Sequence, residues 1–162
     1  LVDTGINTLT GSRLKKMSQF IDNEPFMLTY ADGVSDINID KLLSFHHSHK
    51  KIATMTAVRP SARFGEIEFD GDTVAEFNEK PQLHDGWING GFFVMNSEFL
   101  NFIGNENVML EREPLIKAVS KRELMSFKHD GFWQCMDSKR DHEILEKIYS
   151  SGNVPWVKNN NK

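Results

Sequence analysis

The order of apolar segments between residues 26 and 58 constrains the fold of this chain more than any other feature. Phe26–Tyr30 is a short apolar run that ends in the turn residues Ala31-Asp32-Gly33, and residues 52–58 are rich in β-branched side chains. Between them, apolar side chains recur with the spacing of one helix face, at Ile39, Leu42, Leu43 and His46. A strand, a helix and a second strand in this order predict a parallel pair of strands in an α/β fold.

Strand and helix signals continue to alternate along the rest of the chain. We expect a hairpin of Phe64–Phe69 and Val74–Glu79 around Asp70-Gly71, strands over Trp87–Val94, Leu124–His129 and Phe132–Met136, and helices over Ser97–Ile103, over Glu111–Arg122 and from about Ser138. Asp36 or Asn38 is expected to cap the helix that follows it, and Ser97 to cap its own. The sequence therefore predicts one α/β domain with a mixed sheet over residues 1–157, followed by a frayed tail over residues 158–162.

Composition narrows the classes of function. The chain has 162 residues, of which 39% are hydrophobic, and this suffices for one domain with a buried core. A net charge of −4 provides no attraction for nucleic acid or for an anionic membrane surface. No run approaches the length of about 18 apolar residues that a membrane span needs. The one cysteine, Cys135, cannot form an internal disulfide, which favours a reducing, cytoplasmic location.

Two aspartates are candidate ligands for a hard cation such as Mg²⁺. Asp32 directly follows an apolar strand, at the kind of strand end where α/β proteins bind ligands. Asp137 follows the strand predicted over Phe132–Met136 and precedes a helix. Each residue has a structural alternative, since Asp32 can bond its own turn and Asp137 can cap the helix. Both alternatives stay open at the level of the sequence.

Three further stretches combine polar side chains with glycine or proline. Glu79-Lys80, before Pro81, offers a carboxylate to sugar hydroxyls and an amine to phosphate, or is a solvated strand end. Asn89-Gly90-Gly91 lets a ligand lie against the backbone, or is a β-bulge. Thr10-Gly11-Ser12-Arg13 precedes an amphipathic run and suits a base edge or a phosphate, or is a helix cap.

The remaining reactive side chains are weaker candidates. His46 and His49 are neighbours on the predicted helix, but no acidic or cysteine partner completes a metal set with recognisable spacing. We interpret them as part of a partly solvated helix face. Cys135 lies in an apolar strand and is interpreted as a core residue rather than a nucleophile.

The motifs follow one another in an order that closely resembles the sugar-nucleotide nucleotidyltransferase family. The resemblance runs from Leu1 to about Trp156 and rests on Val2-Asp3-Thr4-Gly5, Thr10-Gly11-Ser12-Arg13-Leu14, Tyr30-Ala31-Asp32-Gly33-Val34, Arg63-Phe64-Gly65, Phe77-Asn78-Glu79-Lys80-Pro81, Ile88-Asn89-Gly90-Gly91-Phe92-Phe93-Val94 and Phe132-Trp133 through Met136-Asp137. It implies a Rossmann-like mixed sheet flanked by helices and an enzyme that makes a sugar nucleotide for polysaccharide biosynthesis.

The resemblance also implies roles for individual residues. Asp32 and Asp137 match the two carboxylates that hold Mg²⁺. Glu79, Lys80, Asn89 and Gly90 match the pocket for glucose 1-phosphate, and Thr10–Arg13 with Ala31 match residues around the cytidine of CTP. The implied reaction is attack of a sugar-phosphate oxygen on the α-phosphorus of CTP, which yields CDP-glucose and pyrophosphate. The resemblance further suggests a homo-oligomer.

One family feature has no counterpart in the 162 residues. Members of the family begin with a strand and a glycine-rich loop of the type G-G-x-G-T-R, which cradles the triphosphate, and no such segment occurs here. We therefore expect this chain to be the later, sugar-binding and metal-holding part of a larger domain, and to be nearly inactive by itself. Two other classes of function are a glycosyltransferase, which would carry a D-x-D triplet after a strand, and a non-catalytic module that assembles through unpaired strand edges.

Overall fold

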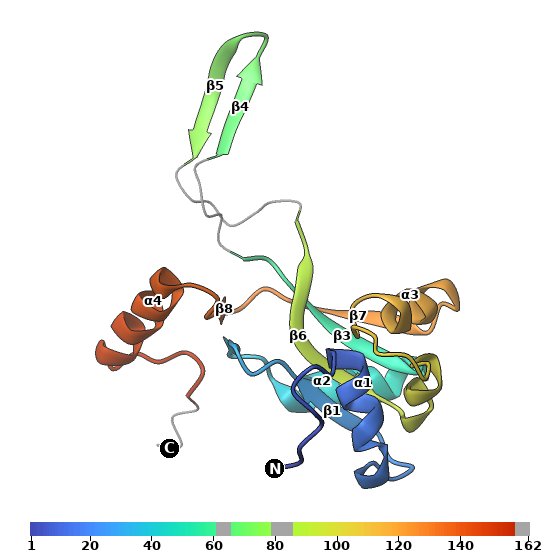
Figure 1. Cartoon of the computed structure of the whole chain (residues 1–162). Coiled ribbons are helices and arrows are strands. Elements are labelled where there is room, and N and C mark those ends of the chain that lie inside the picture. Colours follow the sequence, from blue (N-terminus) through green and yellow to red (C-terminus); the bar gives the residue numbers. More distant parts are fainter. Residues whose placement is uncertain (61–65, 79–85, 158–162) are drawn as a thin grey trace. The chain divides into compact units, whose positions relative to one another are not determined.

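A computed structural model describes residues 1–60, 66–78 and 86–157, and Figure 1 traces the chain through its elements. Two compact units are built from interleaved segments. The first unit comprises Leu1–Tyr30, Asn38–Thr56 and Gly91–Phe127, and the second comprises Ala31–Ile37, Ala57–Gly90 and Lys128–Lys162. The tail predicted over residues 158–162 lies outside the described residues.

The first unit is centred on a sheet. The described strands form a four-stranded sheet in the order β1 (Phe26–Thr29), β6 (Ile88–Met95), β3 (Ala53–Val58) and β7 (Leu124–His129). The same unit holds the helices α1 (Thr10–Lys16), α2 (Ile39–His49) and α3 (Glu113–Ser120) and the 3-10 helices η1 (Met17–Phe20) and η2 (Ser97–Phe102). A mixed sheet flanked by helices confirms the predicted α/β class.

The order of the strands corrects one expectation. β1 and β3 were expected to pair directly, but β6 lies between them, and β1 is antiparallel to β6 with Phe26 opposite Met95. The cause is the apolar character of β6, which is buried at Phe93, Val94 and Met95 in succession. A strand that is buried on both faces is stabilised in the interior of a sheet, where both of its edges find partners.

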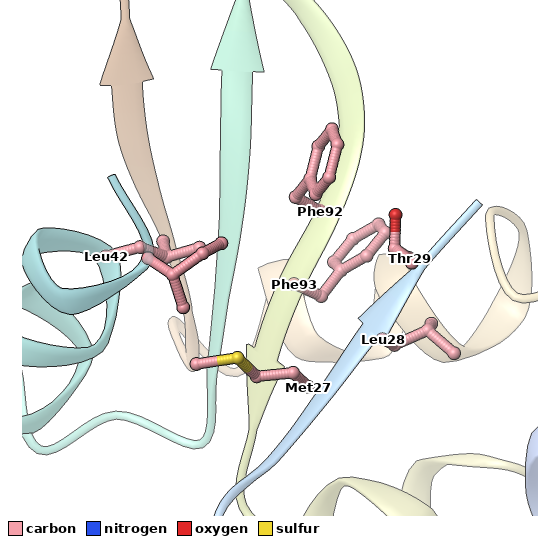
Figure 2. Close-up of a pocket in the computed structure, with 7 residues that line it drawn as sticks. Met27, Leu28, Thr29, Leu42, Phe92 and Phe93 are labelled. Atoms are coloured by element: carbon pink, nitrogen blue, oxygen red, sulfur yellow. The ribbon is translucent and has the colours of Figure 1, made fainter. Parts of the chain in front are cut away.

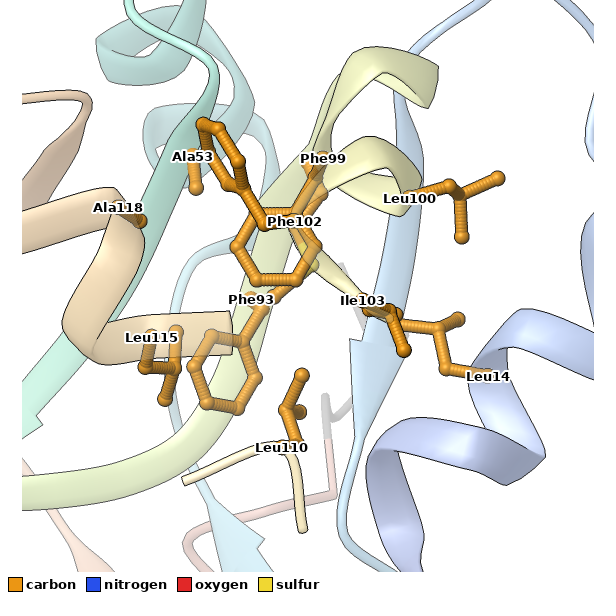
Figure 3. Close-up of a cluster of buried hydrophobic side chains, with 11 residues drawn as sticks. Leu14, Ala53, Phe93, Phe99, Leu100, Phe102, Ile103, Leu110, Leu115 and Ala118 are labelled. Atoms are coloured by element: carbon orange, nitrogen blue, oxygen red, sulfur yellow. The ribbon is translucent and has the colours of Figure 1, made fainter. Parts of the chain in front are cut away.

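A cluster of buried apolar side chains forms the core of the first unit. Figure 3 shows side chains from α1, β3, β6, η2 and α3 meeting there. Its members are Leu14, Ala53, Phe93, Met95, Phe99, Leu100, Phe102, Ile103, Leu110, Leu115 and Ala118. Phe93 and Phe99 are the largest of the fully buried side chains, so this cluster supplies much of the hydrophobic stabilisation of the unit.

Helix α2 begins as predicted but buries its histidine more deeply. Asn38 is the N-cap, and its Oδ1 accepts a hydrogen bond from the backbone N–H of Lys41 at 2.9 Å. His46 is only 2% exposed, and its ring nitrogens lie 2.8 Å from Thr54 Oγ1 and 3.0 Å from Asn96 Oδ1. The expectation of a partly solvated histidine face is therefore wrong at this position, because β3 and the start of η2 cover the ring.

Two helices differ from the expectation at their ends. The predicted helix from Ser97 is the 3-10 helix η2; its N-cap is Asn96, and no side chain caps it. Helix α3 is shorter than the predicted Glu111–Arg122, since Arg122 has a left-handed backbone with a φ of 56°. Within the part of the chain that is described, no helix has both the length and the apolar composition needed to cross a membrane.

The second unit contains a long hairpin. β4 (Glu66–Asp70) and β5 (Thr73–Asn78) are antiparallel, and Gly71 has the positive φ of 60° that a tight turn requires. The hairpin was predicted, although the outer residues Phe64, Gly65 and Glu79 lie outside the described residues. One face carries exposed apolar side chains, namely Ile67, Phe69, Val74 and Phe77.

The second unit also contains a short two-stranded sheet. β2 (Gly33–Ser35) and β8 (Trp133–Cys135) are antiparallel, and helix α4 (Lys139–Ser150) follows β8. The strands predicted on either side of Asp130-Gly131 are both present, but β8 pairs with β2 and not with β7. β2 was not expected, because three residues are too few for a periodic signal.

Candidate functional site

The two candidate aspartates lie at the same end of the β2–β8 pair. Gly33 lies opposite Cys135, and beyond this pair the backbone N–H of Met136 donates to the carbonyl of Asp32 at 2.8 Å. Asp32 therefore lies opposite Met136, and Asp137 is the next residue along. Both aspartates are exposed. Two segments that are about a hundred residues apart in sequence thus present a carboxylate each at the same end of one small sheet.

The structural alternative for Asp137 is wrong. Ser138 is the N-cap of α4, and its Oγ accepts from the backbone N–H of Asp141 at 3.3 Å. Asp141 completes a capping box by accepting from the backbone N–H of Ser138 at 3.0 Å. Asp137 is consequently not needed to begin the helix. Among the hydrogen bonds of the described residues, none joins the Asp32 carboxylate to its own turn, so the turn alternative has no support either.

Cys135 lies beside Asp137 and is not activated. Burial raises the pKa of the Cys135 thiol, and the negative charge of Asp137 together with a hydrogen bond to its side chain raises that pKa further. A thiol whose pKa is raised stays protonated near neutral pH and is a poor nucleophile. This agrees with the interpretation that Cys135 is not a nucleophile, but the side chain is half-buried and lies outside the buried core, so the expectation of a core residue is wrong.

A cluster of polar contacts fastens β2 to the segment before β8. Ser35 Oγ donates to the carbonyl of Phe132 at 2.7 Å, and His129 Nε2 lies 2.8 Å from Asp36 Oδ1 and 3.2 Å from Ser35 Oγ. The serine and the aspartate both contact the same ring nitrogen, whereas a catalytic triad engages both nitrogens. This cluster therefore holds the β2–β8 pair in place rather than forming a hydrolytic site.

Gly90, in the stretch predicted to bind the sugar phosphate, is hydrogen-bonded to β8. It is buried, and its carbonyl accepts a hydrogen bond from Trp133 Nε1 at 2.8 Å. Asn89 precedes it in β6 and is half-buried. Asp32, Asn89, Gly90 and Asp137 thus belong to the second unit. Trp133 is a residue that sequence reasoning missed, because nothing in the sequence shows which carbonyl its indole reaches.

Gly91 serves a different purpose from its neighbour. It has a φ of +78°, and a Cβ at this position would lie 2.8 Å from Cδ2 of Tyr30. The space that its missing side chain leaves is therefore filled by the Tyr30 ring. The other half of the predicted sugar-phosphate pocket, Glu79 and Lys80, lies outside the described residues.

The Thr10–Arg13 stretch forms the first turn of α1 and contacts residues 106–111. Ser12 Oγ accepts from the backbone N–H of Val108 at 2.8 Å. Gly11 is buried so closely against this segment that a Cβ would lie 3.0 Å from the carbonyl oxygen of Val108. Arg13 donates from its guanidinium to Thr4 Oγ1 and to the carbonyl of Ile6. The N-cap is Leu9, without a side-chain cap bond, so the alternative of an ordinary helix cap is wrong.

The donor set at the β2–β8 end suits a hard cation. Carboxylate oxygens with remaining positions for water and phosphate are what Mg²⁺ prefers. Asp32 and Asp137 supply two such carboxylates, and both are exposed. No group of three or more His, Cys, Asp or Glu side chains with metal-binding geometry occurs in residues 1–60, 66–78 and 86–157. A cation here would take its further ligands from water or from a bound molecule.

An apolar pocket lies elsewhere, within the first unit. It is lined by Met27, Leu28, Thr29, Ile39, Leu42, Phe92 and Phe93, and Figure 2 shows these residues coming from β1, α2 and β6. Its walls offer almost no polar groups, and it includes none of the predicted site residues. A sugar phosphate or a nucleotide would find no partner for its charge there.

Comparison with known proteins shows to which family the chain belongs. The sequence profile of the family described as Nucleotidyl transferase matches residues 10–137. Glucose-1-phosphate cytidylyltransferase from Salmonella typhi is 44% identical over 157 residues, which are 96% of this chain and 61% of that protein. Probable glucose-1-phosphate cytidylyltransferase from Bacillus subtilis is 33% identical over 156 residues, again 61% of its length. The chain therefore spans about three fifths of these curated relatives.

Solved structures support the fold. HddC from Yersinia pseudotuberculosis is similar with a TM-score of 0.67 at 16% identity, over 92% of this chain and 65% of that one. A putative glucose-1-phosphate thymidylyltransferase from Bacillus anthracis has a TM-score of 0.65 at 14% identity, over 89% of this chain and 62% of that one. The profile match covers most of the chain and includes Asp32 and Asp137, and on this ground the chain belongs to the nucleotidyl transferase family.

Proposed function

We propose that this chain provides the metal-holding and sugar-phosphate-binding part of an enzyme that makes CDP-glucose and pyrophosphate from CTP and glucose 1-phosphate. The observation that carries the proposal is the β2–β8 pair, in which the backbone bond from Met136 to Asp32 sets Asp32 opposite Met136, the residue before Asp137. The activities after which the relatives from Salmonella typhi and Bacillus subtilis are named support the choice of substrates.

The reaction needs alignment and charge stabilisation more than covalent chemistry by the protein. A phosphate oxygen of glucose 1-phosphate attacks the α-phosphorus of CTP, the new P–O bond forms as the bond to the β-phosphate oxygen breaks, and pyrophosphate leaves. Bound Mg²⁺ supplies neutralisation of the phosphate charges. Asp32 and Asp137 would hold it from the ends of two strands that the His129 cluster fixes in place, so that the site needs little rearrangement during the reaction.

The other predicted residues have proposed roles as binding groups. Glu79 and Asn89 would bind sugar hydroxyls, Lys80 the phosphate of glucose 1-phosphate, and Gly90 would line the sugar with its backbone. The Thr10–Arg13 stretch and Ala31 would lie around the cytidine. The hydroxyl groups of Thr10 and Ser12 form hydrogen bonds with residues 106–111. The backbone N–H groups of Ser12 and Arg13 donate to the carbonyls of Val108 and Leu9, so direct contact with the nucleotide would come from the other backbone groups of this turn.

The test of this proposal is the chemistry of the products. CTP and glucose 1-phosphate are incubated with the protein and Mg²⁺, and pyrophosphate and CDP-glucose are quantified. Pyrophosphate release supports nucleotidyl transfer, whereas release of CDP or UDP from a sugar nucleotide would support a glycosyltransferase. Because the 162 residues contain no glycine-rich triphosphate loop, we expect slow turnover by this chain alone. Turnover near normal enzyme rates would contradict that expectation.

Two substitutions give the product assay its specificity. Asp32→Asn and Asp137→Asn each remove a negative charge with little change of shape, and each is expected to lower pyrophosphate release at least about 100-fold, in line with the loss of preorganised electrostatic groups. Asp40→Asn on α2 is the matched control, since Asp40 is an exposed aspartate of the other unit. Equal activity of all three variants would contradict the metal role.

We also propose that the protein associates into a homo-oligomer and works in the cytoplasm. The apolar face of the β4–β5 hairpin supports association, because its four side chains, Ile67, Phe69, Val74 and Phe77, are 46% to 67% exposed and a lone hairpin is marginally stable in water. The double variant Phe69→Thr, Phe77→Thr should lower the mass measured by light scattering and leave the circular dichroism spectrum unchanged. An unchanged mass above that of the monomer would exclude this face.

A further inference from the structure

One carboxylate of the first unit links three elements and has no role in the site described so far. Glu111 lies just before α3. Its Oε1 accepts a hydrogen bond from the Tyr30 hydroxyl at 2.5 Å, and its Oε2 accepts one from Thr10 Oγ1 at 3.0 Å. The two oxygens of one carboxylate thus hold a residue at the end of β1 and the first residue of α1. A carboxylate that accepts from two hydroxyl groups is a strong and directional bridge.

The Thr10 side chain is fully oriented by this bridge. Its Oγ1 accepts from the backbone N–H of Leu110 at 2.9 Å while its own proton goes to Glu111. Two hydrogen bonds thus run in series, from the N–H of Leu110 to Thr10 and from Thr10 to Glu111, and the donor and acceptor of each are determined. Such a chain of bonds fixes where the first turn of α1 begins, and this is the turn proposed to lie around the cytidine.

Tyr30 is held on its other sides as well. Its backbone N–H donates to the carbonyl of Gly91 at 3.0 Å, and its ring fills the space beside the Cα of Gly91. The ring also packs against Phe93, with 5.7 Å between centroids. The phenol therefore reaches Glu111 from a ring that cannot swing away. Along the chain, Tyr30 leads directly into Ala31 and Asp32.

We infer that Glu111 is a positioning residue of the proposed nucleotidyl transfer. Its carboxylate joins Thr10, at the turn proposed to lie around the nucleotide, to Tyr30, which is two residues before the proposed metal ligand Asp32. The inference rests on the proposed function. Glu111 does not touch substrate; it fixes the distance between the start of α1 and the end of β1, and so prepares the nucleotide side of the site before CTP binds.

The experiment measures CTP affinity by isothermal titration calorimetry in the presence of Mg²⁺. Glu111→Gln keeps the shape but replaces one acceptor oxygen with a donor, and Tyr30→Phe removes the hydroxyl alone. Each variant is expected to bind CTP about tenfold more weakly, which corresponds to about 1.4 kcal/mol. The double variant is expected to bind CTP no more weakly than Glu111→Gln alone, because Tyr30→Phe removes one half of the bridge that Glu111→Gln already disrupts. Affinity for glucose 1-phosphate should stay unchanged.

Two controls separate positioning from a loss of folding. Glu113→Gln changes a carboxylate two residues away that pairs with Lys117 on the surface of α3, and it should leave CTP affinity unchanged. Tyr149→Phe removes the exposed tyrosine of α4, so that Tyr30 becomes the single tyrosine of the chain. In that background, the ring carbon signal of Tyr30 in an NMR spectrum should shift when Glu111→Gln is added, whether or not a ligand is present.

The outcomes distinguish this inference from the proposed function. If the unsubstituted chain binds CTP and both variants bind it equally well, Glu111 does not position the site and the inference is overturned. The same holds if affinity for glucose 1-phosphate falls in parallel with that for CTP, since this indicates a general structural loss. If the unsubstituted chain binds no CTP while the Tyr30 signal still reports the bridge, the proposed function fails, and the bridge is then an element of the fold alone.

Discussion

Gly91 shows at the scale of one residue how a sequence motif can serve the fold. The pair Gly90-Gly91 looks uniform in sequence, yet the carbonyl of Gly90 binds Trp133 while Gly91 makes room for the Tyr30 ring. Only the second of these uses needs a residue without a Cβ and with a positive φ. The two glycines therefore have different tolerances to substitution.

Gly91→Ala is expected to destabilise the fold by about 2–3 kcal/mol, because it combines an unfavourable backbone conformation with a contact of 2.8 Å to Tyr30. Urea unfolding followed by circular dichroism measures this. Gly104→Ala is the matched control, since a Cβ there would meet nothing within 4 Å, and it should change the free energy of unfolding by less than about 0.5 kcal/mol. Equal effects of the two substitutions would refute the account of Gly91.

The lowered pKa of His49 is expected to make the folded chain less stable at mildly acidic pH. Burial lowers the pKa of His49 below its ordinary value of 6.5, and the neighbouring charge of His46 lowers it further. Lys51 acts in the same direction and Glu123 opposes it. The unfolded chain therefore binds a proton at a higher pH than the folded chain does, and stability falls as pH falls below about 6.5. At neutral pH the contribution is fully present.

We expect the melting temperature to drop between pH 7.5 and pH 5.5, and to drop less in a His49→Gln variant. Differential scanning fluorimetry at the two pH values measures both. This window lies above the range in which Glu123 titrates, because the bond from Lys51 lowers the pKa of that carboxyl from 4.5. His142→Gln, on the exposed side of α4, is the control. An equal drop in the His49 and His142 variants would contradict the assignment.

At the scale of the elements, helix α4 is capped by Ser138 and not by Asp137. Ser138 and Asp141 close a capping box, and the buried Asp141 also lies 3.3 Å from Nε2 of Gln134 in β8. Ser138→Ala should destabilise the protein by about 1 kcal/mol, the usual cost of losing an N-cap, as measured by thermal unfolding. Ser120→Ala, near the end of α3, is expected to have a smaller effect. A Ser138→Ala variant as stable as the original chain would show that Ser138 is not the cap.

Elements with periodic side chains could be predicted from the sequence, whereas their partners could not. The stripe of α2, the apolar run of β6 and the Asp70-Gly71 turn of the hairpin carry local signals, and the structure confirms these elements. The position of β6 between β1 and β3, and the pairing of β8 with β2, depend on contacts between distant segments. A three-residue strand such as β2 is stabilised by its partner, and its own sequence contains no signal of it.

The same distinction applies to the candidate site. Asp32 and Asp137 could be named as candidates from their places after predicted strands, but their proximity follows from the β2–β8 pairing alone. Trp133 and Glu111 could not be found, because each acts through side-chain contacts with distant residues. Glu79 and Lys80 stay predictions, as does the nucleotide role of Thr10–Arg13.

At the scale of the whole molecule, the chain has a core of its own and a pair of carboxylates held by a separate small sheet. It spans about three fifths of its relatives from Salmonella and Bacillus. These three fifths include the core and the proposed metal ligands. They contain no glycine-rich triphosphate loop, and for this reason the turnover of the chain is expected to be slow. Metal binding is therefore a more direct probe of the site than catalytic rate.

The most direct test is Mn²⁺ binding in the presence of CTP, followed by electron paramagnetic resonance, since Mn²⁺ shares the oxygen-ligand preference of Mg²⁺. The account predicts saturable binding by the unsubstituted chain, at least about tenfold weaker binding by both Asp32→Asn and Asp137→Asn, and unchanged binding by Asp40→Asn. Mn²⁺ affinity that is the same in all four proteins, or no binding by the unsubstituted chain, would contradict the claim that these two aspartates form the metal site.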